Sequence, residues 1–155
     1  MRKPEAQAHP QADRLGYLLK RAQHALRTRM DEQLSPLGLT APQYNVLAGV
    51  ALQPGISNAS LARAAFITAQ SMQGIVTNLE RVGLMRRVPH PTHGRIMRSE
   101  LTGKGSHILV RAHKLVAGVE KRMTTGFKKD DIESLRLLLR HCAENMQGES
   151  TGRAE

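Results

Sequence analysis

Cysteine and aromatic residues are scarce in this chain. Its 155 residues include one cysteine, no tryptophan, two phenylalanines and two tyrosines. A lone Cys142 excludes an internal disulfide and a cysteine-based zinc cage, and we expect it to be a buried structural thiol. The core must therefore rest on Leu, Ile, Val, Ala and Met. Leu, Ala, Met, Arg and Gln favour helices, so we predict one mostly helical domain.

Long apolar runs and catalytic motifs are also missing. No stretch of about 18 apolar residues occurs, and the first residues do not resemble a signal peptide, so we expect a cytoplasmic protein with no membrane partner. No phosphate-binding glycine loop, nucleophile elbow, carboxylate pair or triad can be assembled, so we expect neither an enzyme nor a cofactor. The seven histidines have no acidic or cysteine ligands clustered beside them, so no metal site is expected.

Acidic residues are few, and the formal net charge is +10. Residues 35–57 carry no Lys, Arg, Asp or Glu, whereas residues 58–105 carry half of the positive excess. Such an excess attracts polyanions. On charge alone, nucleic acid, anionic lipid and acidic ligands all stay open as partners.

Apolar spacing and capping residues predict the order of elements. Thr40 and Gln43 form a capping-box pattern, Thr68 is a second helix cap, and Gly83 is a helix stop. After Gly83 the apolar period changes from near four to two, which indicates a β-hairpin. The predicted helices cover residues 11–34, 40–52, 58–65, 68–82, 102–123 and 130–146, and the predicted strands cover 84–88 and 96–101.

This order, a short helix, a turn, a helix and a hairpin, predicts a winged helix-turn-helix. In such a fold the second helix lies in the major groove of DNA. The helix after Thr68 has a face of uncharged side chains that can donate to and accept from base edges, and the hairpin is rich in arginine. The residues expected to contact DNA are Arg63, Thr68, Gln70, Ser71, Gln73, Gly74, Thr77, Asn78, Arg86, Arg87, His93, Arg95 and Arg98.

An ordered set of short motifs resembles the MarR family of bacterial transcription regulators. The motifs are Leu37-Gly-Leu-Thr40, Gln43-Tyr44-x-Val46-Leu47, Leu61-Ala62, Leu79-Glu80-x-x-Gly83-Leu84-x-Arg86, Pro91-x-His-Gly94-Arg95 and Leu101-Thr102-x-x-Gly105. The resemblance spans residues 15 to 146. One position departs from the family: the wing acid two residues before the arginine is replaced by His93, so the carboxylate that would orient Arg95 is missing.

The resemblance implies a mostly α fold with a small β-hairpin wing, in which the N- and C-terminal helices form a dimerisation region. It implies a homodimer on a pseudo-palindromic DNA operator, with repression favoured over activation. The expected parts are a flexible arm (1–10), a dimerisation helix (11–36), the winged helix-turn-helix (37–105), C-terminal dimerisation helices (106–147) and a flexible tail (148–155).

Members of such a family typically release DNA when a small ligand binds. An aromatic acid or an acyl-CoA thioester is a candidate effector, and the candidate contacts are Tyr17, Arg21, His24 and Tyr44. Two alternatives stay open: an architectural protein that binds DNA without sequence preference, and a redox sensor acting through Cys142.

Overall fold

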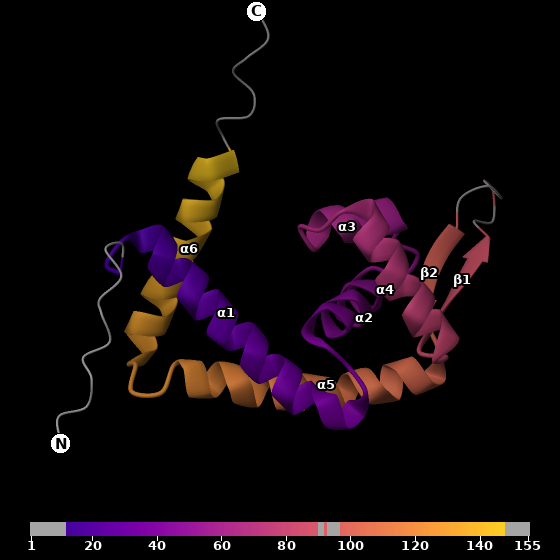
Figure 1. Cartoon of the computed structure of the whole chain (residues 1–155), viewed down its shortest axis with the longest axis horizontal. Coiled ribbons are helices and arrows are strands. Elements are labelled where there is room, and N and C mark those ends of the chain that lie inside the picture. Colours follow the sequence, from indigo (N-terminus) through magenta and orange to yellow (C-terminus); the bar gives the residue numbers. More distant parts are fainter. Residues whose placement is uncertain (1–11, 90–91, 93–96, 148–155) are drawn as a thin grey trace, which may run out of the picture. The chain divides into compact units, whose positions relative to one another are not determined.

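The computed structural model describes residues 12–89, 92 and 97–147 of the chain, and it divides into two compact units, Met1–Val119 and Glu120–Glu155. Figure 1 traces its elements. Within the described ranges the helices are α1 (Leu15–Leu34), α2 (Ala41–Leu52), α3 (Asn58–Ala64), α4 (Ala69–Arg81), α5 (Gly103–Met123) and α6 (Lys129–Gln147), with a 3₁₀ turn at Ser35–Leu37 and strands β1 (Met85–Pro89) and β2 (Met97–Leu101). The predicted mostly helical fold with a β-hairpin is confirmed.

The corner between α1 and α2 is built from short-range signals. Thr40 Oγ1 accepts from the Gln43 backbone N–H, and Gln43 Oε1 accepts from the Thr40 N–H, which confirms the capping box. A further cap comes from α1, because Asp31 Oδ1 accepts from the Ala41 N–H at 2.6 Å. The α1 carboxylate therefore joins the end of α1 to the first turn of α2.

The α4 helix ends in a glycine-dependent turn. Gly83 has φ of +74°, its N–H donates to Glu80, and the Leu84 N–H donates back to Leu79. This is a Schellman arrangement, which requires a left-handed residue at the position of Gly83. Leu84 takes part in this turn through its N–H, so β1 begins one residue later than predicted, at Met85.

The hairpin strands pair antiparallel, with Arg86 opposite Glu100 and Val88 opposite Arg98. A third backbone segment joins the hairpin, because the Gly55 N–H donates to Ser99 and the Ser99 N–H donates to Ile56. The hairpin is therefore fixed to the turn that precedes α3. On its other side, Thr102 Oγ1 donates to the Gly83 carbonyl and accepts from the Gly105 N–H, which confirms Thr102 as the cap of α5.

The core of the first unit is made almost entirely of aliphatic side chains, as the composition predicts. Its fully buried large side chains come from α1, α2, α4 and β1: Leu34, Val46, Leu47, Val50, Met72, Val76, Leu79 and Met85. The α5 helix adds Leu109, Ala112 and Val116. Ile75 packs only partly against this core, and Val82 is exposed.

The α6 helix lies in the second unit and buries none of its residues in the single chain. Ile132 and Leu135 are half-buried, whereas Leu138 and Leu139 are exposed. The expectation of a buried Cys142 is wrong for the single chain, in which this thiol is exposed. The physical reason is that α6, as described, has no buried residue, so its apolar side does not enclose the thiol.

The described residues lack two further kinds of feature. Among them, no helix is both long and apolar enough to cross a membrane. Within the same ranges, no group of three or more His, Cys, Asp or Glu side chains is placed to hold a metal ion.

Candidate nucleic-acid interface

The α4 helix has two opposite faces. Met72, Val76 and Leu79 are fully buried on its inner face. The outer face carries exposed, uncharged residues, which we call the recognition surface: Gln70, Ser71, Gln73, Gly74 and Thr77. These side chains match the chemistry of base edges, and their placement agrees with the residues predicted to read DNA.

The first turn of α4 is capped by Thr68, as predicted. Its Oγ1 accepts from the Ser71 N–H at 3.1 Å and donates to Ser71 Oγ at 2.9 Å. Both residues are exposed at the start of the helix. The N-terminal turn of α4 is therefore ordered, and its free N–H groups favour an anion such as a DNA phosphate.

Gln73 is held by hydrogen bonds at both ends of its amide. Asn58 Nδ2, at the start of α3, donates to Gln73 Oε1 at 2.8 Å, and Gln73 Nε2 donates to Thr77 Oγ1 at 3.1 Å. An amide group has one further donor and one further acceptor position, the pair that glutamine uses to bind adenine. Asn58 was not among the predicted site residues, because its partner lies 15 positions away.

Asn78 lies elsewhere than predicted. It is half-buried, and its Oδ1 accepts from Gln43 Nε2 of α2 at 2.8 Å. The prediction that it faces outward with the other polar side chains of α4 is therefore wrong. The reason is that a polar side chain at the α2–α4 contact finds a partner in the same capping glutamine that begins α2.

Arg63 is an exposed residue in the last turn of α3. Its guanidinium donates to Ser60 Oγ at 3.0 Å, and Ser60 in turn belongs to the serine cap that starts α3. A serine hydroxyl does not neutralise the guanidinium. The charge of Arg63 therefore stays available for a phosphate.

The hairpin arginines are less free than their number suggests. Arg86 is paired with Glu100 across the strands, at 3.0 Å. Arg87 makes a two-pronged contact with Glu80 of α4, through Nε at 2.9 Å and through its terminal nitrogen at 2.7 Å. Such forked pairs fix geometry as well as charge, so Arg87 fastens the hairpin to the end of α4.

Arg98 is half-buried, and its guanidinium lies directly over Gly55, in the space that a side chain at position 55 would fill. Gly55 has φ of +87°, so this turn favours glycine for two reasons. His93 and Arg95 lie outside the described residues, and their contact with DNA stays a prediction.

The four residues expected to bind an effector lie on α1 and α2. Tyr17 is half-buried on α1, and Arg21 and His24 are exposed on the same helix. Tyr44 of α2 makes a 2.9 Å hydrogen bond between its hydroxyl and Nδ1 of His113 on α5, and the rings meet edge to face at 5.5 Å. Sequence reasoning did not include His113, which lies 69 residues further along the chain.

A helix-turn-helix whose second helix exposes a set of uncharged polar residues, followed by a hairpin fixed to that helix, defines a winged-helix DNA-binding protein. The MarR family model matches residues 37–96. The chain is 38% identical over 109 residues to the HTH-type transcriptional repressor Rv2887 of Mycobacterium tuberculosis, covering 70% of this chain and 78% of that protein. This chain belongs to the MarR family, whose members are transcriptional regulators.

Two solved structures give the same fold. One is the MarR family protein Rv2887 of Mycobacterium tuberculosis in complex with salicylic acid, with a TM-score of 0.69, 33% identity, and coverage of 83% of this chain and 95% of that chain. The other is the transcriptional repressor CouR bound to a 23-mer DNA duplex, with a TM-score of 0.82, 31% identity, and coverage of 90% and 99%.

Proposed function

We propose that this protein is a transcriptional repressor that binds a pseudo-palindromic operator as a homodimer. The observation that carries the proposal is the recognition surface of α4, a set of exposed, uncharged residues opposite an inner face that is buried in the core. The transcriptional repressor CouR, of the same fold, was solved bound to a DNA duplex, which supports DNA binding by this chain. Family membership supports action on the bacterial chromosome, in the cytoplasm.

Dimerisation is supported by the exposed apolar residues at the two ends of the chain. Leu15, Leu18 and Leu19 are exposed on α1, and Leu137, Leu138 and Leu139 are exposed on α6. Exposed leucines in such numbers favour burial against a second chain. We propose that residues 11–36 and 106–147 form the dimerisation region, and that two recognition helices then meet half-sites about one helical turn apart.

Operator binding is tested with DNA from the promoter regions adjoining the gene, by gel shift and footprinting. We expect a protected pseudo-palindrome bound roughly a thousandfold more tightly than random duplex. Gln73→Ala should lower this ratio, whereas Arg63→Ala should weaken binding to both duplexes alike. Equal affinity of the unaltered protein for operator and random duplex would favour an architectural DNA-binding protein instead.

We further propose that a small aromatic acid releases the operator. The relative Rv2887 was solved with salicylic acid, and the Tyr44–His113 pair of this chain offers an aromatic edge and a hydrogen-bonding group between α2 and α5. Tyr17, Arg21 and His24 are the proposed α1 contacts. Salicylate added to the operator complex should release the DNA, and Tyr44→Phe should require more salicylate. An operator complex unchanged by aromatic acids and by acyl-CoA thioesters would contradict this part of the proposal.

A further inference from the structure

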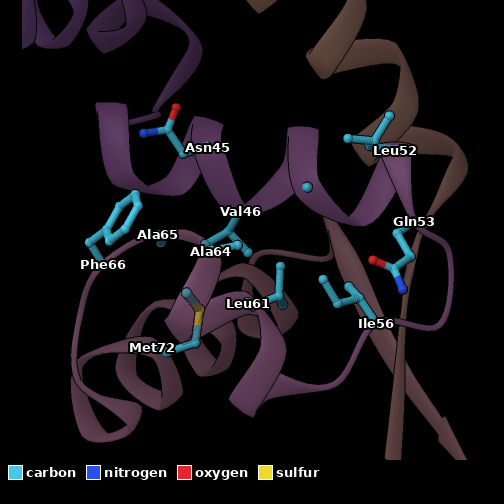
Figure 2. Close-up of a pocket in the computed structure, with 11 residues that line it drawn as sticks. Asn45, Val46, Leu52, Gln53, Ile56, Leu61, Ala64, Ala65, Phe66 and Met72 are labelled. Carbon is cyan, nitrogen blue, oxygen red and sulfur yellow. The ribbon is translucent and has the colours of Figure 1, made fainter. Parts of the chain in front are cut away.

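A hollow lies within the winged helix-turn-helix, between α2 and α3 (Figure 2). Its volume is about 380 Å³, and its walls include Val46, Ile56, Leu61 and Met72. The exposed amides of Asn45 and Gln53 add polar groups to the lining. The hollow contains none of the four residues proposed to bind an aromatic acid, and none of the recognition surface.

The lining has no charged side chain, although the chain carries a net charge of +10. Asn45, Val46 and Gln53 belong to the stretch 35–57, which lacks ionisable Lys, Arg, Asp and Glu side chains altogether. A carboxylate would lose its hydration in such a site without gaining a cation. An uncharged aromatic molecule with one or two hydrogen-bonding groups fits both the apolar walls and the amides, and the volume lies within the range of small-molecule sites.

Phe66 forms part of the wall at the turn between α3 and α4 (Figure 2). Its ring is 86% exposed, and its backbone has φ of +54°, a conformation that is costly for a bulky residue. Leu52, on the α2 side, is also exposed. Two large apolar side chains beside a hollow lose exposed surface when a ligand fills it, which favours binding.

The hollow is connected to the recognition surface through α3 and α4. Met72 is a fully buried residue of α4, so a ligand would touch the inner side of the helix whose outer side reads DNA. Leu61 and Ala64 line the hollow from α3, and Asn58 at the start of the same helix holds Gln73. A ligand that shifts α3 relative to α4 would change the Asn58–Gln73 contact.

We propose that the hollow between α2 and α3 is an effector site for an uncharged aromatic ligand, and that its occupation weakens operator binding. The effect on operator binding rests on the proposed function, whereas ligand binding in the hollow does not. The lining shares no residue with the site proposed for aromatic acids.

Binding is tested on the full-length protein with naphthalene-2-carboxamide. Naphthalene-2-carboxylate, a charged analogue of similar size, serves as the comparison. Ala64→Phe fills the hollow from an exposed position of α3, and Ala51→Phe is the control at an exposed position of α2 outside the lining. Thermal melting first establishes that both variants fold. We expect the amide to bind the unaltered protein and Ala51→Phe with a Kd of about a millimolar or tighter, and Ala64→Phe at least about tenfold more weakly. Amide-induced shifts in the NMR spectrum should include Met72.

Binding of the amide to Ala64→Phe as tightly as to the unaltered protein, or no binding to either, would overturn the site. If the carboxylate binds more tightly than the amide, and Ala64→Phe abolishes that binding, the proposed preference of the hollow for uncharged ligands is wrong. For regulation, the amide should weaken operator binding by the unaltered protein and not by Ala64→Phe. Amide binding without any change in operator affinity would overturn the effector role. Failure of the proposed function is distinct, because it shows as a lack of operator preference with no amide present.

Discussion

Gln43 of α2 donates a hydrogen bond from Nε2 to Oδ1 of Asn78 on α4, at 2.8 Å, while its own Oε1 accepts from the Thr40 backbone. One side chain therefore caps α2 and holds the recognition helix against it. The two partners are 35 residues apart in sequence and both are half-buried. The spacing between α2 and α4 thus depends on a polar contact as well as on the apolar core.

Truncating this contact should destabilise the protein in a non-additive way. We expect Gln43→Ala to lower the free energy of unfolding by about 1–2 kcal/mol, because it removes a cap and a hydrogen bond, and Asn78→Ala by about 1 kcal/mol. The double variant should lose less than the sum, with a coupling of at least about 0.5 kcal/mol. Urea denaturation at one fixed protein concentration measures all four proteins, and strict additivity would contradict the contact.

Gly74 lies on the recognition surface with open space around it. Gly74→Ala should stabilise α4 by about 0.5–1 kcal/mol, since alanine is the better helix former. Operator affinity should nevertheless fall, by about tenfold, because the added methyl group stands between the helix and the base edges.

The matched control for Gly74 is Gly103→Ala in the first turn of α5, outside the proposed dimerisation region, where a methyl group also meets nothing within 4 Å. It should leave operator affinity unchanged. If both variants bind the operator like the unaltered protein, Gly74 does not approach DNA.

Arg87 and Arg63 should separate structural from DNA-contacting arginines. Arg87→Ala removes the forked pair with Glu80 and should cost about 1 kcal/mol of stability, with little change in the salt dependence of operator binding. Arg63→Ala should leave stability nearly unchanged and reduce the slope of log affinity against log salt by about 1. If Arg87→Ala instead reduces the salt slope and leaves stability nearly unchanged, Arg87 contacts phosphate.

Gly105 marks the closest approach between α5 and the turn after α4. A methyl group there would collide with the Leu84 carbonyl oxygen. We expect Gly105→Ala to lower the free energy of unfolding by about 2–3 kcal/mol, because backbone must shift. Gly103→Ala, where a methyl group meets nothing within 4 Å, is the control and should melt near the unaltered protein.

The sequence was most informative where structure depends on neighbours along the chain. Thr40, Thr68 and Thr102 all cap the helices predicted for them, because a cap and its partner are only three residues apart. The inner face of α4 followed from its apolar spacing in the same way. Residues close together in the sequence were therefore enough to predict which residues form the recognition surface.

Long-range pairing could not be predicted. Nothing in the sequence joins Gln43 to Asn78 or Tyr44 to His113, since either partner could equally have faced solvent. The hairpin arginines were counted as free charge, yet Arg86 and Arg87 meet acids that only the strand register and the end of α4 bring to them. Cys142 was predicted to be buried because it lies on the apolar side of α6, but the described α6 buries none of its residues.

The Asp31 cap on α2 has a consequence for the order of folding. It joins residues only ten positions apart, and the Thr40–Gln43 box lies immediately beyond it. Contacts of such short range close small loops and form quickly. The α1–α2 corner can therefore take shape on the ribosome while the hairpin is still being translated, and later segments condense on a corner that already exists.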